Sequence, residues 1–141
     1  MSNSSPIQIE LTTRFKKDLT KLAKRYRSIR HDLNPLLDQL QTGEIIGDLI
    51  SGLKYQVYKV RLKNSNINKG KSSGYRVLYY LKTKTNLILI TIYSKSDQSD
   101  IQNNIIETII PLSSLLEKNT ILRHFRHFNW WLGWRKFVKI S

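Results

Sequence analysis

The sequence contains no cysteine. This absence excludes a disulfide framework, thiolate chemistry and a zinc site built on cysteine ligands. The sequence also lacks a run of about 18 apolar residues, the length that a membrane-spanning helix requires. Its first residues carry no basic, apolar leader, so we expect no signal peptide. These absences fit a protein of the reducing cytoplasm.

Signals for metal or cofactor binding are equally scarce. The three histidines, His31, His124 and His127, are too scattered along the chain to predict a metal site. The GKSSG stretch at residues 70–74 lacks the spacing of a phosphate-binding loop and does not connect a strand to a helix. We therefore expect neither a metal ion nor a small-molecule cofactor.

Positive charge, by contrast, is in large excess. The chain carries 24 lysines and arginines against 10 acidic residues, which gives a formal net charge of +14. Such an excess favours a polyanionic partner, and charge alone leaves open a nucleic acid, an anionic membrane or an acidic protein. The plainer alternative is a solvated basic surface. The length of 141 residues, 40% of them hydrophobic, fits one domain with a modest core.

Hydrophobic spacing predicts a strand and a helical hairpin early in the chain. Residues 7–11 form the strand, and Thr12 or Thr13 offers a hydroxyl as the N-cap of the first helix. The second helix is expected to start near Asp32, with Pro35 in its first turn, where a missing N–H does little harm. Each helix has one apolar face.

Three strands and a last helix follow a loop over residues 47–54. The strands are predicted from their β-branched and aromatic residues at 55–63, 75–82 and 86–93. Asp97 is the candidate N-cap of the last helix, which passes through Ile101, Ile105, Ile106 and Ile109 and is stopped by Pro111.

The predicted order of elements is β-α-α-β-β-β-α. This order indicates an α+β domain, with the helical hairpin packed on one face of a mainly antiparallel sheet. The other face of the sheet can then be open to solvent. We place this domain at residues 1–111.

Residues 112–141 differ in kind and are treated as a basic, Trp-rich C-terminal extension. They hold all three tryptophans and six lysines and arginines against Glu117. Such a segment could contact a membrane surface, stack on RNA bases or pack on the sheet. An extension without a function is an equal alternative.

Basic side chains gather on the expected open face. Because side chains alternate along a strand, a core of Tyr58, Val60 and Leu62 turns Lys59, Arg61 and Lys63 to the other face, in a line of about 13 Å. On the next strand, Arg76, Tyr80 and Lys82 face the same way. On the last strand, a core of Ile88, Ile90 and Ile92 turns Tyr93 and Lys95 outward.

A patch of this kind can cleave RNA without a metal. The ribose 2′-hydroxyl is a built-in nucleophile, which must lose a proton as it attacks the adjacent phosphate. Arginine makes charged, bidentate contacts with phosphate, and lysine among other cations can exchange protons near neutral pH. Residues 55–95 contain no His, Asp or Glu, so electrostatic stabilisation of the transition state would carry most of the effect. The alternative is a solvated sheet face.

Three segments carry a resemblance to a known family. They are GLKYQVYKVRLK at residues 52–63, GKSSGYRVLYYLK at 70–82 and LITIYSKSDQSDI at 89–101. In this order, and with the basic helical hairpin before them, they resemble the RelE/ParE toxin superfamily and, within it, the RelE/HigB-type mRNA interferases. The resemblance covers about residues 7–110 and implies a RelE-like fold for the domain.

The resemblance also implies an activity, partners and roles for single residues. It implies the toxin of a type II toxin–antitoxin system, an endoribonuclease that cuts mRNA on the ribosome and is held inactive by a cognate antitoxin. Lys59 and Arg61 match the family's paired basic residues, of which one acts as the base and the other holds phosphate. Arg76 matches the arginine that stabilises the transition-state phosphate. Lys95 matches an arginine that serves as general acid or phosphate clamp.

The sequence departs from the family pattern at one position. Where the family has a tyrosine that stacks on a base, this chain has Ile101, and the nearby Tyr93 is the candidate substitute. Further residues expected to contact RNA are Lys63, Lys71, Tyr80 and Lys82. Two other readings stay open: a ParE-like inhibitor of DNA gyrase, which would not need the cluster of Lys59 and its neighbours, and an inactive RNA- or membrane-binding relic.

Overall fold

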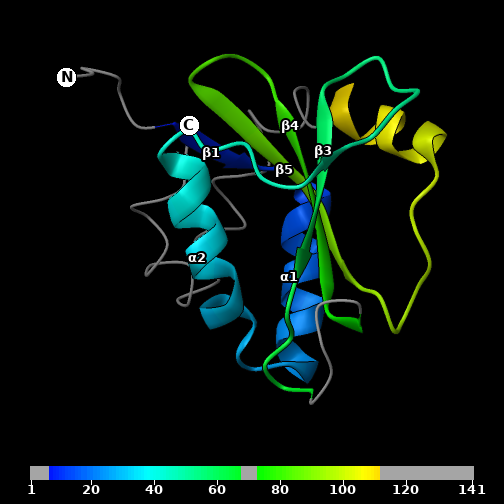
Figure 1. Ribbon diagram of the computed structural model, residues 1–141. Coiled ribbons are helices and arrows are strands. Elements are labelled where there is room, and N and C mark those ends of the chain that lie inside the picture. Colours follow the sequence, from blue (N-terminus) through cyan, green and yellow to red (C-terminus); the bar gives the residue numbers. More distant parts are fainter. Residues whose placement is uncertain (1–6, 68–72, 112–141) are drawn as a thin grey trace.

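The computed structural model describes residues 7–67 and 73–111, and the extension at 112–141 and Lys71 lie outside them. The described residues form an α+β domain, as predicted (Figure 1). Its elements are β1 (Gln8–Leu11), α1 (Thr13–Arg25), α2 (Ile29–Gln41), β2 (Asp48–Leu49), β3 (Val57–Leu62), β4 (Tyr75–Leu81), β5 (Asn86–Ser94) and a helix over residues 103–111.

The five strands form one sheet in the order β1-β5-β4-β3-β2. β1 runs parallel to β5 and the other neighbours are antiparallel, which confirms a mainly antiparallel sheet. β2 was not predicted, because residues 47–54 were expected to form a loop. Only two of its residues pair with β3, Asp48 with Lys59 and Leu49 with Tyr58. A strand this short has no alternating pattern to detect.

The helical hairpin starts as predicted at its first cap and differs at its second. The hydroxyl oxygen of Thr12 accepts a hydrogen bond from the Phe15 amide at 2.9 Å, and the same hydroxyl donates to the Ile90 carbonyl at 2.6 Å. α2 begins at Ile29, so Asp32 lies in its first turn and Pro35 lies inside the helix. An acidic side chain interacts favourably with the positive, N-terminal end of the helix dipole. It does so in the first turn as well as at the cap position.

The main core lies between the hairpin and one face of the sheet. The hairpin contributes Phe15, Leu19, Leu33 and Leu37 to it, all fully buried. From the sheet come Tyr58, Val60, Tyr75, Val77 and Tyr79. The alternation expected for β3 is therefore confirmed, because Tyr58 and Val60 point to the helices.

The opposite face of the sheet is covered over part of its area. A second apolar cluster joins Val57 and Leu78 of the sheet to Ile106, Ile109 and Ile110 of the helix over residues 103–111. This helix and the hairpin lie on opposite sides of the sheet (Figure 1, yellow against blue and cyan). The expectation of a solvent-exposed face is wrong for this covered part, because the isoleucine stripe of the last helix packs on it, whereas Arg61 on the same face is exposed.

The sides of β5 also differ from the prediction. Ile88, Ile90 and Ile92 were expected on one core face, but Ile92 lies in the main core and Ile90 in the second cluster. A β-bulge lies between these residues: Leu78 pairs with Thr91 while its neighbour Tyr79 pairs with Leu89. Because both faces of β5 are covered, its apolar run carries no alternation from which the bulge could be read.

Candidate functional site

The strands β3 and β4 bring three basic residues to one face of the sheet. Arg61 lies directly opposite Arg76, and Lys59 lies opposite Leu78, the neighbour of Arg76 two positions along β4. Arg61 is exposed and the Lys59 side chain is 28% exposed. The sequence-predicted residues Lys59, Arg61 and Arg76 therefore share one face, next to the second apolar cluster.

Gly74 fixes the entry of the chain into β4. A Cβ atom at this position would stand 1.9 Å from the Leu62 carbonyl oxygen, so only glycine allows this close approach to β3. The Gly74 carbonyl also accepts a hydrogen bond from the Lys95 amide at 2.9 Å. The segment just before Arg76 is thus fixed against both neighbouring strands.

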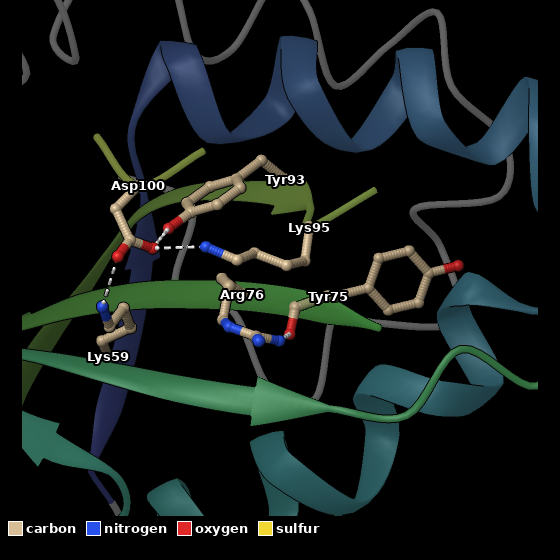
Figure 2. Close-up of polar contacts among 6 residues, drawn as sticks. All are labelled: Lys59, Tyr75, Arg76, Tyr93, Lys95 and Asp100. Carbon is tan, nitrogen blue, oxygen red and sulfur yellow. Dashed lines mark hydrogen bonds and ion pairs between the residues drawn. The ribbon is translucent and has the colours of Figure 1, made fainter. Parts of the chain in front are cut away.

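Arg76 is the most enclosed cation of the cluster. Only 5% of the residue is exposed, although the sequence predicted an open position. It lies between Arg61 on β3 and Tyr93 on β5, and its guanidinium donates to the Tyr75 carbonyl oxygen at 3.2 Å (Figure 2). A central strand and the covering helix explain this burial. A guanidinium held by its own backbone is already oriented before any anion arrives.

An acidic residue, Asp100, sits at the centre of the site. Its Oδ1 atom accepts from the Tyr93 hydroxyl at 3.1 Å and from the Lys95 ammonium at 3.4 Å. Its Oδ2 atom lies 3.3 Å from the Lys59 ammonium. Figure 2 shows these three side chains pointing to the one carboxylate. The structure therefore brings Tyr93 and Lys95 together with Lys59, as expected for one site.

Asp100 was missed by the sequence reasoning, which found no acidic residue within the three strands. It lies beyond β5, in the segment over residues 95–102. No periodic pattern shows where such a segment returns. The available signal was composition: Asp97 and Asp100 are two of only 10 acidic residues in a basic chain, and both lie in a motif that already pointed to the site.

The two acidic groups of the site have opposite pKa shifts. Burial, together with the nearby charge of Asp100, raises the pKa of Tyr93 to about 12. Partial burial raises the pKa of Asp100, but hydrogen bonds from Tyr93 and Lys59 outweigh it and hold this pKa below its usual value. At neutral pH the Tyr93 hydroxyl is therefore a proton-bearing donor and Asp100 a carboxylate.

Asp97 anchors the same segment to the hairpin. Its carboxylate lies 2.7 Å from the Arg25 guanidinium of α1. Asp97 was expected to cap the last helix, but that helix begins at residue 103, and Ile101 precedes it. The carboxylate therefore pairs with a guanidinium of the hairpin instead of capping the last helix.

The remaining sequence-predicted residues in the described part of the chain are not among the donors that bind Asp100. Lys63 and Lys82 follow the ends of β3 and β4 and are exposed. Lys82 is six residues from Arg76, about 20 Å along the strand. Tyr80 is half-buried and packs edge-to-face on Tyr55, with ring centroids 5.2 Å apart. Their contacts with RNA stay predictions, as do the catalytic roles of the cluster.

Residues 7–67 and 73–111 contain neither a metal-binding cluster nor a membrane-spanning helix. Within these ranges, no three or more His, Cys, Asp or Glu side chains come close enough to hold a metal ion. Within the same ranges, no helix has the length and apolar character to cross a membrane.

Comparison with protein families gives the class. The family model described as the RelE toxin of the RelE/RelB toxin–antitoxin system matches residues 12–121, which include the whole cluster. The chain therefore belongs to the RelE toxin family, and it is by this membership a toxin of a toxin–antitoxin system, with an antitoxin as its partner. No protein in a search of curated proteins matches the chain.

Proposed function

We propose that this toxin is an endoribonuclease that cuts mRNA on the ribosome, in the cytoplasm, without a metal ion. The observation that supports it most directly is the pairing of Arg61 with Arg76, with Lys59 on the same face, in a chain of the RelE toxin family. A phosphodiester has two non-bridging oxygens, which two guanidinium groups can bind at once.

The cluster divides the work of the reaction among its members. Arg76 and Arg61 stabilise the negative charge that grows on the phosphoryl oxygens, and a buried guanidinium does so more strongly than an exposed one. Lys59 accepts the 2′-hydroxyl proton in its neutral amine form, since an ammonium has no lone pair and arginine keeps its proton at physiological pH. The products are a 2′,3′-cyclic phosphate and a free 5′-hydroxyl.

Tyr93 and Lys95 serve the leaving group. The pKa of Tyr93, raised by burial to about 12, keeps its hydroxyl protonated at neutral pH. This hydroxyl can donate to an oxygen that becomes an alkoxide in the transition state, but it cannot act as a base. Lys95, whose ammonium shares Asp100 Oδ1 with this hydroxyl, is the second donor.

The test maps mRNA ends after induced expression of an Arg76→Ala variant. We expect cleavage within translated codons by the wild type and a loss of about 100-fold or more in the variant, the effect of removing a donor that stabilises the transition state. Arg27→Ala is the matched control, because Arg27 is an exposed arginine outside the cluster. An Arg76→Ala chain that folds, cuts and arrests growth like the wild type would contradict the proposal. DNA breaks that depend on gyrase, with intact mRNA, would instead support a ParE-like inhibitor.

A further inference from the structure

The donors around Asp100 form an anion site that is already filled from within the chain. Lys59 comes from β3, Tyr93 from β5 and Lys95 from the residue after β5, yet all three donate to one carboxylate. Their spacing is set by the sheet, since Tyr93 pairs with Arg76 and Arg76 pairs with Arg61. The donors therefore stand on a fixed framework, while the acceptor belongs to a connecting segment.

The bound group resembles a phosphodiester in charge and shape. A carboxylate and a phosphodiester each carry one negative charge and two equivalent terminal oxygens. Asp100 uses both of its oxygens, one towards Lys59 and the other towards Tyr93 and Lys95 (Figure 2). The non-bridging oxygens of a nucleic-acid phosphate would meet the same donors.

From this match we infer that Asp100 occupies the position of a substrate phosphate, so that the segment over residues 96–102 competes internally with RNA. The identity of the displaced anion as an RNA phosphate rests on the proposed function. The inference adds that this phosphate is held by Lys59, Tyr93 and Lys95 together. RNA enters the site only when Asp100 has left it.

The contacts of Asp100 are suited to exchange. Its side chain is 54% exposed and those of Lys59 and Lys95 are 28% and 35% exposed, so water screens both ion pairs. Residues 96–100 are all exposed, so none of them is a buried core side chain. The ends are held, because Ser94 belongs to β5 and the last helix packs in the second apolar cluster. A short, tethered segment can thus leave and return without unfolding its neighbours.

The test measures binding of a single-stranded RNA oligonucleotide whose riboses are 2′-O-methylated, so that the attacking hydroxyl is blocked. We expect Asp100→Ala and Asp100→Asn to bind it roughly 3- to 10-fold more tightly than the wild type. The apparent affinity of the wild type is reduced in proportion to the fraction of molecules in which Asp100 has left the site, and this fraction is small when Asp100 fills the site most of the time. Asp38→Asn, an exposed change of equal charge on α2, should change the affinity less than twofold.

A second background separates competition from a general change in charge. In a Lys59→Met chain, which lacks one of the shared donors, the gain from Asp100→Ala should be largely lost, a coupling that a double-variant cycle measures. An Asp100→Ala chain that binds no better than Asp38→Asn, or an equal gain with and without Lys59, would overturn the inference.

This experiment can fail separately from the proposed function. The blocked oligonucleotide reports binding alone, so a chain that never cuts mRNA can still show the gain, and then only the proposed activity is wrong. If the chain cuts mRNA and Asp100→Ala brings no gain, the activity stands and the internal competition is wrong.

Discussion

Single residues of the site combine buried and exposed charge. Arg76 and Tyr93 are 5% and 4% exposed, while Asp100 reaches the Tyr93 hydroxyl from a surface segment. A buried donor is a strong anion ligand but is hard for a large substrate to reach. For Tyr93, the exchange of Asp100 against a phosphate resolves this conflict, since the exposed carboxylate accepts from the hydroxyl until RNA arrives.

The tyrosines give a prediction on pH at this scale. Burial, first among the causes, raises the pKa of Tyr93 and of Tyr79 from 10.0 to about 12. The folded chain therefore holds these protons more tightly than the unfolded chain, so their contribution to stability is complete below about pH 10 and is lost as the pH rises towards 12. The free energy of unfolding should fall in this window.

Urea denaturation at pH 9 and pH 11 checks this prediction. Tyr93→Phe keeps the ring in the second apolar cluster and removes the titrating hydroxyl, so the drop in unfolding free energy should be smaller than in the wild type. Tyr80→Phe is the control, because it removes a hydroxyl from a half-buried ring that packs on Tyr55, and it should leave the drop unchanged. Equal drops in wild type and Tyr93→Phe would contradict the assignment.

Among the elements, the helix over residues 103–111 has the largest effect on the site. It covers the sheet face that carries the cluster, and its Ile106 is 1% exposed against Val57, Leu78 and Tyr93. Lys54 binds the same helix, since its amide donates to the Glu107 carboxylate at 3.1 Å. The helix therefore contributes to the burial of Tyr93.

A pair of isoleucine variants tests this packing. Ile106→Ala should lower the free energy of unfolding by about 2–4 kcal/mol, because it removes a fully buried side chain and leaves a cavity. Ile105→Ala is the matched control. The Ile105 side chain is 39% exposed, so the loss in free energy of unfolding should stay under about 1 kcal/mol. Chemical denaturation of both variants measures the difference. Equal losses would mean that the helix does not pack on the sheet in this way.

Across the whole molecule, a strand could be predicted correctly from the sequence where its two faces differ in polarity. β3 was predicted with its correct faces because one side is apolar and the other is charged, so the alternation of Val60 with Lys59 and Arg61 is plain. β5 was not, because both of its faces are buried and a bulge shifts its register. The covering of the second sheet face was not predicted, because it rests on a long-range contact between the isoleucines of the last helix and Val57 and Leu78 of the sheet.

The site likewise contains residues that the local strand pattern predicts and one residue, Asp100, that it does not. Lys59, Arg61 and Arg76 follow from strand alternation and pairing, which are local. Asp100 belongs to a connecting segment whose path is set by the pair of Asp97 with Arg25 and by the packing of the last helix. Neither contact has a periodic signature in the sequence. The separation of residues 112–141 as an extension stays a prediction, since they lie outside the described residues.

The most direct test of the account uses the chemistry of the cut. The purified toxin is added to ribosomes programmed with an mRNA in which a single 2′-deoxynucleotide replaces the nucleotide at the cleaved position. Because the proposed reaction needs the 2′-hydroxyl as nucleophile, we predict cleavage of the all-ribose mRNA, with a 2′,3′-cyclic phosphate on the upstream fragment, and no cleavage at the deoxynucleotide. Equal cleavage of both messages, or an intact all-ribose message, would contradict it.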